Sequence, residues 1–335
     1  MATITAGAVT PVGGAFATST AASGTFIPTL WSSQLQKKFY TASVFGEISN
    51  SDWAGELKAM GDKVIINTIP TLTVNKYVTG QGLTYEVPTP STIEMTIDQG
   101  LYFAFQVADV IEYQSKINLM DTFSNDASMQ MKIKVDSTCL FNLALNSSYG
   151  TPASGNSGAT AGVKSGAYNL GTNTAPVTLT GSNVLQMLTS FSGVLDEQNV
   201  PETDRFLLID PYTRNLLMQS NLAQAQFMGD SQSMVRNGKI GTIDRFMTYV
   251  SNNLPKGAAG AAMKSGDATE TIGATHSAAR RLLIAGQKSA FSFASQITKT
   301  EQVRNPYDFG DYVRSLQVFG FKATKPEAFA IAYVS

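Results

Sequence analysis

The sequence contains one histidine, His276, and one cysteine, Cys139. Having so few of these residues limits the kinds of catalytic and metal-binding site that the chain could form. A nucleophilic hydrolase needs a histidine base that a carboxylate orients. His276 lies in a polar stretch between Thr275 and Ser277, and nothing around it indicates such a carboxylate or a nucleophile motif. We interpret His276 as an exposed loop residue, and a hydrolase that uses it stays open as an alternative.

The remaining candidate sites are weaker. Cys139 falls on the apolar face of a predicted helix, where a free cysteine behaves as a small buried hydrophobic residue. One histidine and one cysteine far apart in the sequence do not indicate a metal site. Residues 261–266 resemble a phosphate-binding loop superficially, but Ala258 and Met263 occupy the two positions that require glycine. The sequence therefore predicts no catalytic, cofactor-binding or metal-binding residue, and no enzyme.

The composition points away from several classes of protein. Charged residues make up 15% of the 335 residues, against about 25% in an ordinary soluble domain. Charge depletion is typical of surfaces that other chains cover. The net charge is −1 and no basic cluster occurs in the sequence, so the charge pattern does not indicate nucleic-acid binding. No apolar run reaches the roughly 18 residues of a membrane span, and the N-terminus lacks a signal peptide. We expect a soluble protein made in the cytoplasm, with no membrane association.

For two segments, the sequence shows no other part of the chain against which they could pack. Residues 1–25 carry no charged side chain and are rich in small residues, so they form either a disordered tail or an arm that orders only against neighbouring chains. After Pro28, the apolar residues Leu30, Trp31, Leu35 and Phe39 follow roughly helical spacing, which predicts a short amphipathic helix.

The second such segment is a β excursion within residues 52–107. Stretches 61–70, 93–98 and 101–107 are β-branched or alternate in polarity, which predicts strands. Glycine and proline residues between the first two mark turns and edges. An isolated hairpin is marginally stable in water, so a projecting one is expected to pack on another chain.

The rest of the chain predicts an α+β fold. Apolar residues at three- and four-residue steps between 120 and 143 indicate one helix of about 30 residues. A helix is predicted over 182–198 with Ser182 as its N-cap, and another opens with Pro211. Strands are predicted in 205–210, 244–251, 279–286, 289–297 and 311–326, and loops in 148–183 and 257–274.

The order of these elements resembles the major capsid protein of tailed bacteriophages with the Hong Kong 97-type fold, in the branch seen in short-tailed and related phages. The resemblance spans about residues 26–335. It is carried by the stretches FIPTLWSSQL, GDKVIINTI, YVTGQGLTYEVPTPSTIEMTIDQ, YFAFQVADVIEYQS, DASMQMKIKVDSTCL, NGKIGTIDRFMTYVSNNLP and GQKSAFSFASQITKTEQVRNPYDFGDYVRSLQVFGFKATKPEAFAI.

This resemblance implies a division of the chain into four parts. They are an N-terminal arm (1–50), an extended β-loop (51–100), a peripheral domain with a spine helix (101–180 and 287–325) and an axial domain (181–286 and 326–335). In this family the axial domains meet around five- and six-fold axes. The β-loop lies over a neighbouring subunit, and the arm reaches an adjacent one.

The resemblance also implies function and partners. The chain would assemble as hexamers and pentamers into the icosahedral head shell of the virion, around packaged double-stranded DNA held without sequence specificity. Assembly would take place in the host bacterial cytoplasm, with a portal protein and, in some members, a cement or decoration protein. We expect contacts between subunits at five residues: Phe26, Trp31, Lys76, Tyr77 and Tyr85.

The sequence departs from some members of the family. No scaffolding region of roughly 100 residues precedes the arm, so a separate scaffolding protein is expected. Some members join a β-loop lysine to an asparagine covalently; Lys58, Lys63 and Lys76 are candidates by residue type, and we expect no such cross-link. Two further alternatives stay open: an encapsulin-type shell that encloses a cargo enzyme, and a secreted or surface-layer structural protein.

Overall fold

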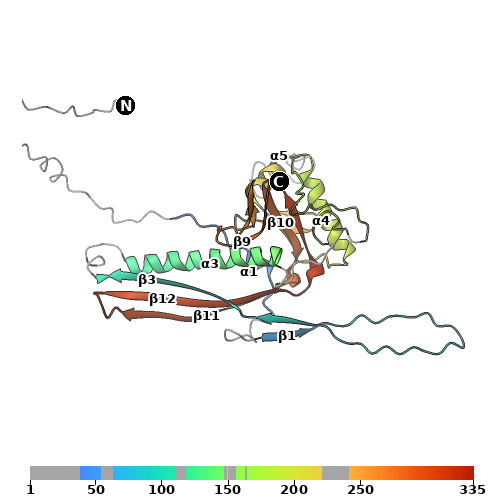
Figure 1. Cartoon of the computed structure of the whole chain (residues 1–335), viewed down its shortest axis with the longest axis horizontal. Coiled ribbons are helices and arrows are strands. Elements are labelled where there is room, and N and C mark those ends of the chain that lie inside the picture. The colour runs from blue at the N-terminus through green and yellow to red at the C-terminus, as the bar shows by residue number, and fades with distance from the viewer. Residues whose placement is uncertain are drawn as a thin grey trace, which may run out of the picture.

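The computed structural model describes residues 38–53, 63–109, 113, 118–146, 149, 156–162, 164–220 and 241–335. Within these ranges the chain is an α+β protein, as the sequence predicts (Figure 1). Two sheets of unequal size share the chain, and a two-stranded ribbon projects from the body. None of the helices in the described ranges has both the length and the apolar character that a membrane crossing requires.

The larger sheet has eight strands and holds most of the core. β10 lies at its centre and pairs with β4, β7 and β13. Its strands are β4 (Arg205–Ile209), β5 (Thr242–Ile243), β6 (Phe246–Val250), β7 (Lys256–Gly257), β8 (Ala261–Lys264), β9 (Thr271–His276), β10 (Arg280–Gln287) and β13 (Phe329–Val334). Every residue of β4 is buried, and its last four residues, 206–209, form an unbroken apolar run rather than an alternation.

Two helices belong to this part of the chain. α4 (Val184–Glu197) buries Met187, Leu188 and Phe191 against the core. α5 (Pro211–Gln219) starts with proline at its first position, as predicted, and the Asp210 carboxylate accepts a hydrogen bond from the Thr213 amide.

The smaller sheet is a long antiparallel three-stranded sheet in the order β11–β12–β3. Its strands are β3 (Gln99–Ala108), β11 (Phe291–Arg304) and β12 (Gly310–Ala323). Helix α3 (Leu119–Leu145) lies along this sheet (Figure 1) and, at 27 residues, confirms the predicted long helix. Phe123 of α3 meets Phe105 of β3 edge-on, with ring centroids 6.0 Å apart.

The chain crosses between the sheets twice at one place. β10 continues through the 3-10 turn η3 (Lys288–Ala290) into β11, and β12 returns through η4 (Pro326–Ala328) into β13. The Thr324 amide donates to the Ala290 carbonyl at 2.9 Å, and the rings of Phe291 and Phe329 pack with centroids 4.6 Å apart. One core therefore runs through this junction and joins the two sheets.

The projecting ribbon consists of β1 (Lys63–Asn67) and β2 (Thr92–Thr96), paired antiparallel from Lys63–Thr96 to Asn67–Thr92. Its base is fixed because Met95 and Ile97 are buried against Ala294 and Val318 of the three-stranded sheet. The chain passes so close to Gly320 that a Cβ there would overlap the Thr96 carbonyl oxygen. In Figure 1 the extension beyond this ribbon and the β11–β12 turn lie at opposite ends of the molecule.

Three local predictions are wrong. Residues 257–274 form β8 and the start of β9 rather than a loop. Asn183, not Ser182, precedes α4, and its side chain binds the backbone of Thr178 and Thr180 instead of capping the helix. Phe39, assigned to a helix after Pro28, lies in a non-helical segment, and the rest of that predicted helix is outside the described residues.

Candidate subunit interface

Exposed apolar side chains gather on the extension beyond β1 and β2. Residues 68–91, all of which the structure describes, form no strand and carry many large apolar side chains in solvent. These exposed side chains are Ile69, Leu72, Val74, Tyr77, Val78, Leu83, Tyr85 and Val87. An exposed apolar patch of this extent is typical of a surface that binds another protein.

A few polar contacts join the two limbs of the extension. The Thr68 amide donates to the Ser91 carbonyl at 2.8 Å, and the Thr73 amide donates to the Glu86 carboxylate at 3.1 Å. At the tip, Gly80 adopts a positive φ of 88°, which favours glycine. The tip encloses a hollow of about 400 Å³ lined by residues 75–78 and 81–84.

The predicted contact residues divide into two groups. Lys76 and Tyr77 line the hollow at the tip, and Tyr85 is exposed on the returning limb. Phe26 and Trp31 lie outside the described residues. Contact with another subunit at each of these positions stays a prediction.

A second exposed surface is the face of the three-stranded sheet opposite α3, which the sequence analysis missed. Tyr102 of β3 pairs with Leu316 of β12, and Tyr312 pairs with Val303 of β11, so these exposed side chains share one face. The signal that could have found this surface in the sequence is alternation, because each of these residues alternates along its strand with residues of the opposite, more buried face.

A third exposed group lies at the β11–β12 turn, where Tyr307 and Phe309 are 94% and 74% exposed. The turn is closed by the Asn305 amide, which donates to the Gly310 carbonyl at 2.9 Å. Below it, Arg304 binds the carboxylates of Asp109 and Asp311, and its hydrogen bond holds the pKa of Asp109 below the ordinary value. The two aromatic rings are therefore presented on a well-fixed turn.

Beside these apolar surfaces, a polar joint fastens α3 to the rest of the body. Asp136 of α3 is 1% exposed, and its Oδ1 accepts hydrogen bonds from the amides of Val44 and Phe45 at 2.9 and 2.7 Å. These amides belong to the start of α1 (Phe45–Ile48), so Asp136 caps that short helix from a distant element. Its Oδ2 accepts from Asn253 at 2.6 Å. Burial raises the pKa of Asp136, and these hydrogen bonds partly offset the rise.

Two further carboxylates join α3 to the β8–β9 turn. Asp267 pairs with Lys134 at 2.8 Å and accepts from Ser137. Glu270 accepts from Thr138 and Asn142, each at 2.9 Å. Burial alone would raise the pKa of Asp267, but hydrogen bonds from Lys134 and nearby hydroxyls outweigh it and hold the pKa well below its ordinary value.

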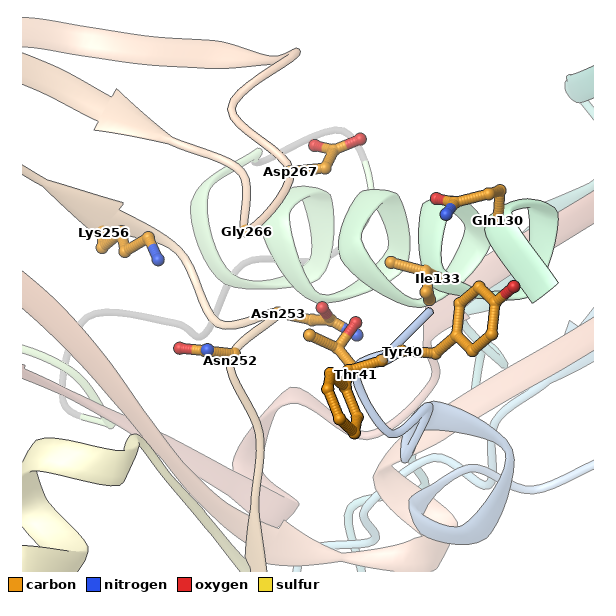
Figure 2. A pocket seen from close by; sticks show the side chains of 10 residues that line it. Tyr40, Thr41, Gln130, Ile133, Asn252, Asn253, Lys256, Gly266 and Asp267 are labelled. Carbon is orange, nitrogen blue, oxygen red and sulfur yellow. The ribbon is translucent and has the colours of Figure 1, made fainter. Parts of the chain in front are cut away.

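A hollow of about 280 Å³ lies at the edge of this joint, between α3 and the chain that leads into α1 (Figure 2). Tyr40 and Thr41 line one side, and Gln130 and Ile133 of α3 line another. Phe39 also lines it, and Asn253 and Asp267 are among the lining residues from the loops of the larger sheet.

His276 and Cys139, the two residues considered for catalysis, both lie in environments typical of structural residues. His276 lies at the end of β9 rather than in a loop, and its Nδ1 accepts a hydrogen bond from the Ala278 amide at 3.2 Å. A triad histidine donates from Nδ1 to a carboxylate, so this geometry does not match one. Cys139 is fully buried, as predicted, and burial raises the pKa of its thiol well above the ordinary value. Across the described ranges no group of three metal-ligating side chains occurs.

The candidate cross-link lysines are not gathered together. Lys63 pairs with Glu94 across the ribbon at 3.3 Å, whereas Lys76 lies at the tip of the extension. Lys58 lies outside the described residues.

Comparison with known proteins gives one family. The family model described as phage capsid protein matches residues 90–332. A search of curated protein sequences found no match.

Solved structures extend the likeness to the whole fold. A chain from Mycobacterium phage Che8 is 21% identical, covering 93% of this chain and 98% of its own, with a TM-score of 0.71. The capsid of Cyanophage P-SCSP1u is 16% identical, covers 93% of each chain and has a TM-score of 0.66. The capsid of Ralstonia phage GP4 is 13% identical, covers 97% of each and has a TM-score of 0.59. The chain therefore belongs to the phage capsid protein family, and it is a capsid shell subunit with the Hong Kong 97-type fold of tailed bacteriophages.

Proposed function

We propose that this subunit assembles as hexamers and pentamers into an icosahedral head shell that encloses double-stranded DNA. The observation that carries the proposal is the extension 68–91, which exposes many large apolar side chains while hydrogen bonds join its two limbs. Such a segment gains stability by burial against a neighbouring copy. Lys76, Tyr77 and Tyr85 are its proposed contact residues.

The proposed domains follow the sheets. The ribbon and extension correspond to the β-loop (51–100), and α3 with the three-stranded sheet corresponds to the peripheral domain (101–180 and 287–325). The eight-stranded sheet with α4 and α5 corresponds to the axial domain (181–286 and 326–335). Ser157 and Val177 form bridges to Ile331 and Val334 of β13, so this part of the proposed peripheral domain lies against the proposed axial domain.

The other partners are part of the same proposal. A shell of this kind needs a scaffolding protein in trans, a portal protein at one vertex, and assembly in the host cytoplasm before DNA enters. A decoration protein is a further proposed partner. A formal net charge of −1 fits a shell that encloses DNA without binding it tightly. The family match does not favour an encapsulin-type compartment.

Electron microscopy of the purified chain, expressed with and without the neighbouring phage structural genes, tests the proposal. We expect closed shells with five-fold vertices. Particles from infected cells should contain nuclease-protected double-stranded DNA. Open tubes or soluble monomers under every condition would contradict the assembly proposal, and protein cargo in place of DNA would contradict the proposed content.

A further inference from the structure

Two hollows of the subunit share one wall, the chain that leads from β6 into β7. The first is the hollow between α3 and the chain that leads into α1 (Figure 2). The second, of about 290 Å³, lies between residues 251–256, the start of α5 and Arg281 of β10. Asn252 and Lys256 line both hollows, and both side chains are exposed. The two hollows therefore adjoin, and together they form one recess, which we call the loop recess.

The shared wall is fixed within the subunit. The Ser251 amide donates to the Ile209 carbonyl at 3.0 Å, and the Asn253 side chain donates to Asp136 of α3 at 2.6 Å. Leu254 between them and β7 is buried in the core. The loop recess is therefore formed before a ligand binds, so binding does not have to order this part of the chain.

One charged side chain of the lining has no partner within the described ranges. Asp267 pairs with Lys134 at 2.8 Å, and Asp210 pairs with Arg281 at 3.1 Å. Lys256 forms no hydrogen bond or ion pair with any residue that the structure describes. An unpaired cation on the wall favours a ligand that brings one carboxylate. A polyanion such as a nucleic acid would also meet the carboxylates of Asp210 and Asp267, so it fits the recess less well.

Much of the remaining lining is apolar. Phe39 and Ile133 line the first hollow, and Leu254 lines the second. The ring of Tyr212 also lines the second hollow and lies 3.9 Å from the guanidinium carbon of Arg281. Sites for whole small molecules usually enclose about 300–1,000 Å³, so a hollow slightly below that range suits a single apolar side chain.

One polar atom of the first hollow also lacks a partner. The hydroxyl oxygen of Thr41, which lines this hollow, is buried without a hydrogen-bond partner among the described residues. A buried hydroxyl without a partner is costly, so a backbone group of a ligand that reaches Thr41 gains a hydrogen bond there. Peptide backbone carries both donors and acceptors, so a peptide can supply this group.

We propose that the loop recess binds an extended segment of a partner protein in which an acidic residue is flanked by apolar residues. The acidic side chain pairs with Lys256, and the flanking apolar side chains enter the two hollows. The recess belongs to a single subunit, so the inference goes beyond shell assembly and does not depend on it.

Calorimetric titration of the purified full-length subunit with a short peptide tests the proposal. The probe is Ala-Phe-Asp-Leu-Ala with blocked ends, and we expect a Kd of about 0.1 to 1 mM. The same peptide with asparagine in place of aspartate should bind about tenfold more weakly. Equal binding of the two peptides, or no binding of the first, would overturn the proposal. Tighter binding of an oligothymidylate of five nucleotides would assign the recess to nucleic acid and overturn the proposed partner.

A matched pair of lysine variants isolates the charge of the recess. Lys256→Gln should weaken binding of the acidic peptide about tenfold, because it removes the cation that faces the carboxylate. Lys264→Gln is the control, since Lys264 is the exposed strand partner of Lys256 in β8 and lines neither hollow. We expect full affinity from this control. An equal loss in both variants would show a general effect of charge and would overturn the assignment to Lys256.

Two further variants test the hollows and the direct contact. Asn252→Trp places a large ring in the shared wall and should abolish binding although Lys256 remains. Lys256→Glu should lose the acidic peptide and gain a peptide with lysine in place of aspartate. Both variants should keep the melting temperature of the unaltered subunit, because both positions are exposed. A folded Lys256→Glu variant that does not exchange its preference would overturn the direct pairing.

Shell yield separates this proposal from the proposed function. Lys256→Gln should form shells as well as the unaltered chain. Lost shell yield in this variant, together with no peptide binding by the unaltered subunit, would assign the recess to a second copy and overturn the proposed partner. Failure of the unaltered chain to form shells would contradict the proposed function, and the peptide titration would still decide the present proposal.

Discussion

The joint between α3 and the larger sheet differs from the extension 68–91 in how each uses its side chains. In the joint, buried carboxylates find hydrogen-bond donors within the same chain, as Asp136 does with Val44, Phe45 and Asn253. In the extension, large apolar side chains such as Val74 and Tyr85 face solvent. Polar groups that were left unpaired in the joint would be costly, so it must be complete before assembly. Apolar side chains can remain exposed to water in the free subunit until a partner covers them.

We therefore expect stability and assembly to depend on separate parts of the subunit. Changes in the joint should destabilise the monomer, and changes in the extension should leave the monomer folded but unable to assemble. Four predictions test this separation, beginning with the largest effect.

Deletion of residues 72–90 should abolish shells while leaving a folded subunit. The base of the ribbon keeps Met95 and Ile97 in place, so the core is not opened. Circular dichroism, the melting temperature and electron microscopy together measure this outcome. Normal shells from the deletion variant would show that the extension is not required for assembly. An unfolded deletion variant would show that the extension is needed for the stability of the subunit.

Asp136→Ala should destabilise the subunit by about 3 kcal/mol, because it leaves several buried donors without an acceptor. Asp136→Asn keeps one acceptor oxygen for the amides of Val44 and Phe45 and should cost about half as much. Denaturant unfolding of the monomer measures both. A loss below 0.5 kcal/mol for the alanine variant, on the order of a surface substitution, would contradict the view of this joint as an internal fastening.

Tyr77→Ser and Tyr85→Ser should each reduce shell yield several-fold without lowering the melting temperature. Both side chains are exposed in the subunit, so their removal has little effect on folding, whereas each loses burial against a neighbour. Tyr212→Ser is a useful comparison because Tyr212 is half exposed but already packs over Arg281 at 3.9 Å within its own chain. A drop in melting temperature for Tyr77→Ser with normal assembly would reverse the assignment.

Acid should weaken the joint through Asp267. Its folded pKa lies below the unfolded value of about 3.9, so its stabilisation is present above that pH and is lost as pH falls towards the folded value. Asp267→Asn should therefore cost about 1–2 kcal/mol at pH 7 and progressively less below about pH 4. Unfolding curves at a series of pH values measure the difference. An equal difference at pH 7 and pH 3 would show that the carboxylate charge is not the cause.

Much of the fold could be predicted from local sequence. α3 followed from the helical period of its apolar residues, and the β3 alternation followed from residues such as Phe103 and Phe105. The loop assigned to 257–274 was wrong because its strands are short and rich in glycine and alanine, so pairing with neighbours rather than intrinsic preference creates them.

The interface was harder to predict. Tyr77 and Tyr85, two of the expected contact residues, fall within the predicted β excursion, and both are exposed on the extension. The face of the three-stranded sheet opposite α3 was missed because the sequence alone does not show whether the face that carries a residue such as Tyr102 is covered. Pairing with Leu316, more than 200 positions away, is what places it on an open face.

The class of the fold, the long helix, the projecting segment and the family resemblance follow from the sequence, because each depends on the order and spacing of nearby residues. The joint between α3 and the larger sheet follows only from the folded structure, since Asp136 contacts Phe45 and Asn253 across 91 and 117 positions of sequence. The same is true of the hydrogen bonds that Lys38 and Tyr40 both donate to Asp126. Burial and hydrogen bonding between distant residues are properties of the folded chain, and no local pattern carries them.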